Sequence, residues 1–218
     1  MPAVDEAAPN LQVAEWVQGT PSDVDQERGR VVLIEVFQVN CPGCFIGGLP
    51  EAIQTYLTFK GKPLTVWGLA TGFEDHHLNN LDNLKMLIDT GEVVGETMAH
   101  LSERNMLSMG RLQYFMPFPV AWDTVEKRDA GVKEEEVQRW IERDFPDFES
   151  MSQSHRTQIE KQVREYLENK EYNALTFDQY GLRGTPSSII INKQGILRHK
   201  LLGSGVGLEK YIEPLLNE

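Results

Sequence analysis

The chain has 218 residues, and 40% of them are hydrophobic, which is enough for an ordinary buried core. Its 33 acidic and 21 basic residues give a formal net charge of -12, with no block rich in lysine or arginine. Because this charge repels anionic surfaces, we expect no binding to nucleic acid or to membranes.

The beginning of the chain bears on its expected compartment. Residues 1–8 lack the basic and apolar regions of a signal peptide, and no apolar run of transmembrane length follows. We therefore expect a cytoplasmic protein, or a periplasmic one if a leader segment was removed from this sequence.

The first predicted elements are strands around one helix. Residues 9–18 alternate as a short strand does, and the apolar run 31–37 predicts a buried strand. A helical pattern extends over 46–57, and after the break at 61–63 the run 64–70 predicts another buried strand. This order gives a βαβ unit with a parallel pair of strands.

The later elements continue this pattern with two helical stripes, a short strand, a hairpin and a final helix. They cover residues 81–91, 94–101, 118–122, 187–201 and 208–216. The hairpin is strongly indicated because Lys193-Gln194-Gly195 separates two apolar runs. Together these elements predict an α/β fold with a central mixed sheet flanked by helices.

A charged segment at about 124–175 stands apart from this pattern. It predicts two helices, each apolar on one side only, with Pro146 between them. The chain shows no internal repeat or low-complexity linker, so we expect a single domain, 1–218, that carries this segment as a helical insertion. The insertion either packs on the parent domain or serves as a lid or partner-docking platform beside the cysteines.

The only two cysteines, Cys41 and Cys44, lie three residues apart between the strand at 31–37 and the helix that follows. Backbone N–H groups and the positive end of the helix dipole favour the thiolate at such a turn, and the thiolate attacks disulfides. A zinc site usually has a second cysteine or histidine pair, and a disulfide across so short a loop removes little chain entropy. The spacing therefore favours a redox pair over a metal site or an inert disulfide.

Four motifs resemble those of TlpA-like redoxins with a thioredoxin-like fold, over about residues 8–72 and 175–218. They are Ala8-Pro9-Asn10-Leu11, the turn Gly19-Thr20-Pro21, the strand ending at Cys41-Pro42-Gly43-Cys44, and Gly184-Thr185-Pro186 before the hairpin. The resemblance implies that Pro186 is a cis-proline lying against the cysteine pair. It also implies that the backbone of Thr185 pairs with an extended substrate segment as an added strand.

Two departures from this family concern the cysteine motif itself. Asn40 stands where the family commonly has an aromatic residue, and the dipeptide between the cysteines is Pro42-Gly43 rather than Gly-Pro or Glu-Pro. Pro42 suits the first turn of a helix, where a missing N–H costs little. Gly43 lets another part of the backbone approach closely.

Glu35 lies six residues before Cys41, where the thioredoxin resemblance places a buried acidic residue. Burial in an apolar strand raises the pKa of a carboxyl group toward the working range of a proton acceptor. We expect Glu35 to take the proton of Cys44 when that thiol attacks the mixed disulfide. Alternation alone also allows Glu35 to face solvent at a sheet edge.

The expected function is that of a thiol-disulfide oxidoreductase without a cofactor or a metal. Cys41 attacks a substrate disulfide and Cys44 resolves the mixed disulfide, and the reverse steps oxidise a dithiol. The expected partners are a protein or small-molecule thiol or disulfide and an unidentified redox partner.

Two other functions fit parts of the same sequence. Pro42-Gly43-Cys44 with Leu49-Pro50 resembles atypical two-cysteine peroxiredoxins, in which Cys44 would react with peroxide, although the Pro and Thr usual ahead of that cysteine are absent. The second is a non-enzymatic metal-binding module in which the two cysteines join His76 or His77.

Overall fold

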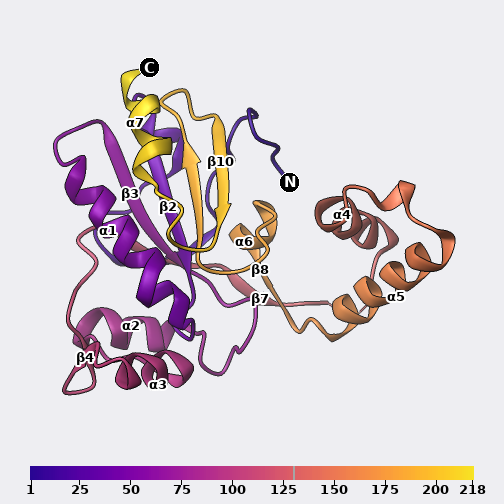
Figure 1. Ribbon diagram of the computed structural model, residues 1–218, viewed down its shortest axis with the longest axis horizontal. Coiled ribbons are helices and arrows are strands. Elements are labelled where there is room, and N and C mark those ends of the chain that lie inside the picture. Colours follow the sequence, from indigo (N-terminus) through magenta and orange to yellow (C-terminus); the bar gives the residue numbers. More distant parts are fainter. Residues whose placement is uncertain (130) are drawn as a thin grey trace. The chain divides into compact units, whose positions relative to one another are not determined.

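The computed structural model describes residues 1–129 and 131–218 (Figure 1). Within it the chain forms two compact units, one of residues 1–125 and 174–218 and one of residues 126–173. The second unit lies inside the segment at about 124–175 for which the sequence predicts a helical insertion.

The first unit is built on a six-stranded sheet with the strand order β1-β6-β3-β2-β9-β10. Its strands are Val13–Gln18 (β1), Val31–Phe37 (β2), Leu64–Ala70 (β3), Val120–Asp123 (β6), Ser187–Ile191 (β9) and Leu197–Leu202 (β10). β3 pairs in parallel with β2 and with β6, whereas the other neighbours pair antiparallel. The predicted mixed central sheet is therefore confirmed, and β2 is one of its interior strands.

Five helices accompany this sheet in the described part of the first unit. They are Leu49–Thr58 (α1), Leu81–Thr90 (α2), Gly95–Glu103 (α3), Leu175–Gln179 (α6) and Glu209–Asn217 (α7). Smaller elements are the 3-10 turn Val24–Glu27 (η1), the π turn Cys44–Gly48 (η2) and the hairpin strands Leu107–Ser108 (β4) and Arg111–Leu112 (β5). No helix among the described residues is both long enough and apolar enough to cross a membrane.

The side chains of β2 alternate between two cores, one on each face of the sheet. Leu33 and Phe37 belong to a core that also contains residues of α1, α2, α3 and α7. Ile34 and Val36 belong to a second core, formed with α6 and the N-terminal segment. Position 35 shares the face of positions 33 and 37, so Glu35 points into the core that α1 covers.

The second unit contains the helices Glu134–Asp144 (α4) and Gln153–Asn169 (α5), with the 3-10 turn Phe148–Ser150 (η3) between them. The short strands Val125–Lys127 (β7) and Tyr172–Ala174 (β8) pair where the segment leaves and returns. Its core consists of Val137, Ile141, Phe148, Val163 and Leu167. The two predicted apolar stripes therefore cover each other within this unit.

Candidate active site

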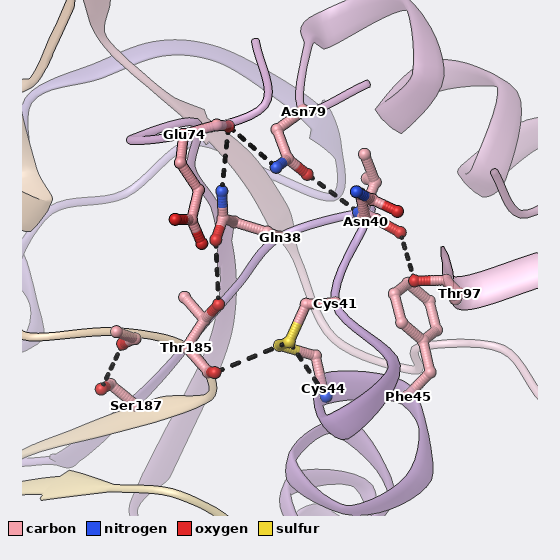
Figure 2. The surroundings of a disulfide bond; sticks show 12 residues. Gln38, Asn40, Cys41, Cys44, Phe45, Glu74, Asn79, Thr97, Thr185 and Ser187 are labelled. Carbon is pink, nitrogen blue, oxygen red and sulfur yellow. Dashed lines mark hydrogen bonds between the residues drawn. A yellow bond between two sulfur atoms is a disulfide. The ribbon is translucent and has the colours of Figure 1, made fainter. Parts of the chain in front are cut away.

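Cys41 and Cys44 form a disulfide at the start of the helical segment that follows β2 and contains η2 (Figure 2). Their Cα atoms are 5.4 Å apart, an ordinary distance for a disulfide. Cys44 is fully buried, whereas Cys41 is partly exposed. A molecule that approaches from solvent can therefore contact Cys41 but not Cys44.

Two backbone groups lie close to the Cys41 sulfur. The N–H of Cys44 donates a hydrogen bond to Cys41 Sγ at 3.2 Å, and the carbonyl oxygen of Thr185 is 3.6 Å from the same atom. Neither sulfur carries a proton in the disulfide, so only the N–H contact is a hydrogen bond in this state. After reduction that N–H and the start of the helix would stabilise negative charge on Cys41.

The loop that leads into β9 packs against the cysteine turn. The Thr185–Pro186 peptide bond is cis, and Pro186 is buried while Thr185 is partly exposed. A β-carbon built on Gly43 would lie 3.7 Å from Pro186 Cδ, which places the proline directly beside the inter-cysteine dipeptide. The hydroxyl of Thr185 donates to Gln38 Oε1 at 3.1 Å, so this loop is also tied to the segment that precedes Cys41.

Glu35 has no exposed surface. Its Oε2 accepts a hydrogen bond from Ser188 Oγ at 2.6 Å, while its Oε1 has no hydrogen-bond partner among the residues that the structure describes. Burial raises the pKa of Glu35 from an ordinary 4.5 to about 8, and this effect outweighs the lowering by the Ser188 hydrogen bond. The alternative in which Glu35 faces solvent at a sheet edge is wrong, because β2 is an interior strand.

Gly48, in the π turn, lets three parts of the site come together. A β-carbon at this position would lie 2.4 Å from Glu35 Oε1 and 2.5 Å from Pro186 Cβ. A β-carbon does not come this close to a non-bonded atom in real proteins, so the arrangement requires glycine here. The unpartnered carboxyl oxygen thus lies against the same turn that begins with Cys44.

Comparison with solved structures gives whole-chain similarities. A protein described as a thioredoxin-like superfamily protein is 26% identical, with a TM-score of 0.59 over 98% of this chain and 97% of the other. The chain has a thioredoxin-like fold. Two further structures match in fold. A thiol-disulfide isomerase from Corynebacterium glutamicum is 23% identical, with a TM-score of 0.57 over 98% of this chain and 97% of that one. A thiol:disulfide interchange protein DsbE from Chlorobium tepidum is 14% identical, with a TM-score of 0.50 over 100% and 97%.

Neither family models nor curated proteins give a match to this chain. Its fold and its Cys41–Cys44 disulfide together indicate an oxidoreductase. The narrower likeness to TlpA-type redoxins stays a prediction.

Side chains from two other segments fix the backbone just before Cys41 (Figure 2). Asn79 Oδ1 accepts the N–H of Asn40 at 2.8 Å, and Thr97 Oγ1 donates to the carbonyl of Val39 at 2.8 Å. Asn40, at the position of the family's usual aromatic residue, uses its own Oδ1 to accept the N–H of Glu96 at 2.8 Å. The approach to the cysteine pair is therefore held by α3 and by the loop after β3.

The site residues predicted from the sequence all lie around this one turn. They are Glu35, Cys41, Cys44, Thr185 and Pro186. Their roles in catalysis stay predictions.

Sequence reasoning missed Gln38, Asn79, Thr97 and Ser188, which bind these segments together. Ser188 faces Glu35 across the β2–β9 pairing, and only the register of that pairing identifies it. Of these four residues, only Gln38 could have been noticed in the local sequence, because it is a polar residue at the end of an apolar strand.

The structure bears on each of the two alternative functions. Peroxide chemistry at Cys44 would need peroxide to reach a sulfur without exposed surface. Within residues 1–129 and 131–218, no three side chains of His, Cys, Asp or Glu are placed to hold a metal ion together.

Proposed function

We propose that this protein is a thiol-disulfide oxidoreductase in which Cys41 attacks the substrate and Cys44 resolves the intermediate. The observation that carries the proposal is the contrast between the two sulfurs. Cys41 is partly exposed and its Sγ accepts the N–H of Cys44 at 3.2 Å, whereas Cys44 has no exposed surface. The more exposed cysteine is therefore also the one whose thiolate the backbone would stabilise.

The proposed reduction of a disulfide RSSR′ has two steps. The Cys41 thiolate attacks one sulfur, forms the mixed disulfide Cys41–S–S–R and releases R′S⁻. Cys44 then loses its proton and attacks Cys41 Sγ, which restores the Cys41–Cys44 disulfide and releases RS⁻. Two electrons pass from the protein dithiol to the substrate, and the reverse sequence oxidises a dithiol.

Glu35 is the proposed acceptor of the Cys44 proton. Its Oε1 lies against Gly48 in the turn that begins with Cys44, and no described residue occupies it with a hydrogen bond. Since burial raises the pKa of Glu35 to about 8, the ionised fraction that can accept a proton grows as the pH rises toward that value. The second step should therefore accelerate over the same range.

The backbone of Thr185 is the proposed binding place for an extended substrate segment. Thr185 is partly exposed, its carbonyl oxygen lies 3.6 Å from Cys41 Sγ, and its side chain is held by Gln38. Pairing through backbone groups gives affinity without reading side chains, so one site could serve several substrates. The partners proposed on this basis are a protein or small-molecule disulfide or thiol and a separate redox partner.

The test is to trap the intermediate and to measure the potential of the pair. A Cys44→Ala variant should accumulate intermolecular disulfides on Cys41 in cell extracts, and a Cys41→Ala variant serves as the matched control. In glutathione buffers, the wild-type pair should show one two-electron transition between about -270 and -120 mV. The proposal fails if the two cysteines do not pair with each other, or if the Cys44→Ala variant traps no more than its control.

A further inference from the structure

The helical segment that carries Cys44 starts at Pro42 and contains a π turn, Cys44–Gly48. The N–H of Leu49 donates to the carbonyl of Cys44, five residues earlier, rather than to that of Phe45 as in an α-helix. If the π pattern continued, the donor for Phe45 would be residue 50, but Pro50 has no N–H. The buried Phe45 carbonyl is thus left without a donor from its own helix.

Tyr114, in the chain between β5 and β6, supplies that donor. Its hydroxyl donates a hydrogen bond to the carbonyl oxygen of Phe45 at 2.8 Å. Burial raises the pKa of Tyr114 above its ordinary value, so the phenol keeps its proton under working conditions. A buried carbonyl that lost this bond would be unsatisfied, and the turn would have to move to find another partner.

The π turn is also the place where the redox groups meet. Its first residue, Cys44, provides an N–H that is shared between the carbonyl oxygen of Cys41, at 3.0 Å, and Cys41 Sγ, at 3.2 Å. Gly48, at its other end, lies against Glu35 Oε1 and Pro186. A small rotation of the turn would therefore change the alignment of the N–H with Cys41 Sγ.

We propose that Tyr114 is a positioning residue for the redox pair and acts through the carbonyl of Phe45. This inference rests on the proposed function, because it concerns the reactivity of the attacking cysteine. By holding the π turn, the Tyr114 hydroxyl keeps the Cys44 N–H directed at Cys41 Sγ and so stabilises the thiolate of the reduced protein. The residue belongs to a segment 69 positions away from Phe45, and the C-x-x-C motif itself does not point to it.

The test uses the full-length Tyr114→Phe variant, which removes only the hydroxyl group. The reduced protein is alkylated with iodoacetamide over a range of pH, and mass spectrometry follows Cys41. In the variant, we expect the rate of Cys41 alkylation below the midpoint of the pH profile to fall about fivefold, the effect of losing one hydrogen bond. The midpoint itself should move to higher pH, because the thiolate is less stabilised. Since the reduced form loses stabilisation, the equilibrium with glutathione should shift about fivefold toward the protein disulfide.

Tyr180→Phe is the matched control. The Tyr180 hydroxyl also donates to a backbone carbonyl, that of Pro9 at 2.5 Å, and burial likewise raises its pKa. Tyr180 belongs to the core on the other face of the sheet. The Tyr180→Phe variant should lower the melting temperature about as much as Tyr114→Phe does. It should leave the pH profile of Cys41 alkylation unchanged. Equal effects of both variants on that profile, or no effect of Tyr114→Phe, would overturn the inference.

A rescue experiment keeps the test decisive if Tyr114→Phe alone folds poorly. Pro50→Ala restores an N–H that can reach the carbonyl of Phe45, so removing the Tyr114 hydroxyl should alter the Cys41 profile less in this background. If Tyr114→Phe alters the Cys41 profile equally with and without Pro50→Ala, the inference is overturned. If wild-type protein shows no dithiol–disulfide transition, the proposed function itself fails; a normal wild-type transition with an unaltered Tyr114→Phe profile removes only the role of Tyr114.

Discussion

The side-chain carbonyl of Asn40 caps helix α3 by accepting the backbone N–H of Glu96 at 2.8 Å. Val94 occupies the N-cap position of this helix and makes no capping bond with its own side chain. Asn40, the residue directly before Cys41, thus caps a helix that is usually capped by the side chain of its own N-cap residue. Any displacement of α3 would be passed to the start of the cysteine motif.

Asn40→Ala should lower the free energy of unfolding by about 1 kcal/mol, the usual effect of losing a helix cap. Urea denaturation measures this change. The informative control is Val94→Thr, which keeps the side-chain shape and adds a local capping hydroxyl, because the backbone of Val94 is already extended. Asn40→Ala should lower the free energy of unfolding less in the Val94→Thr background than in wild type. An equal loss in both backgrounds would show that Asn40 does not stabilise the protein by capping α3.

Glu35 should make the stability of the protein depend on pH. Its pKa is raised from 4.5 to about 8 in the folded state, so the folded protein holds a proton there that the unfolded chain releases. The resulting stabilisation is complete below the unfolded value and is lost as the pH rises through the folded one, by at most about 1.4 kcal/mol per pH unit. Denaturation of wild type and Glu35→Gln across this range should show the difference, and parallel curves would contradict it.

Glu35→Gln should also slow the second chemical step, since glutamine cannot accept the proton of Cys44. A mixed disulfide preformed on Cys41 of wild type should resolve faster as the pH rises toward 8, the approximate pKa of Glu35. The variant should be slower by about 100-fold and should lack this rise. Stopped-flow detection of the released thiol measures both quantities. Equal rates at every pH would remove Glu35 from the mechanism.

The sequence predicts the site residues that follow local patterns and misses those that depend on register. Glu35 interrupts an apolar strand and the cysteines sit at a strand-to-helix turn, so both could be found without a structure. Ser188 binds Glu35 only because β2 and β9 pair with one particular alignment. Short strands give little information on that alignment, since it is set by tertiary packing.

The same limit applies to the helices. The apolar stripe after Cys44 fits an α-helix or a π turn equally well, and only the donor pattern at Leu49 separates them. In the second unit the stripes bearing Ile141 and Val163 show that each helix needs a cover, but which surface provides it is a matter of tertiary structure. Those two helices turn out to cover each other.

Gly48→Ala should destabilise the protein far more than Gly43→Ala, although both glycines flank Cys44 in the same turn region. A β-carbon on Gly48 would lie 2.4 Å from Glu35 Oε1 and 2.5 Å from Pro186 Cβ, so the Glu35 side chain and the cis-proline loop must both shift, at a cost of about 1–3 kcal/mol. On Gly43 the nearest atom would be Pro186 Cδ at 3.7 Å, an ordinary contact, and its helical backbone accepts alanine. Gly43→Ala should therefore change stability by less than about 1 kcal/mol, with either sign. Urea denaturation of the oxidised proteins compares the two variants, and similar losses would mean that the contact of Gly48 with Glu35 and Pro186 is not tight.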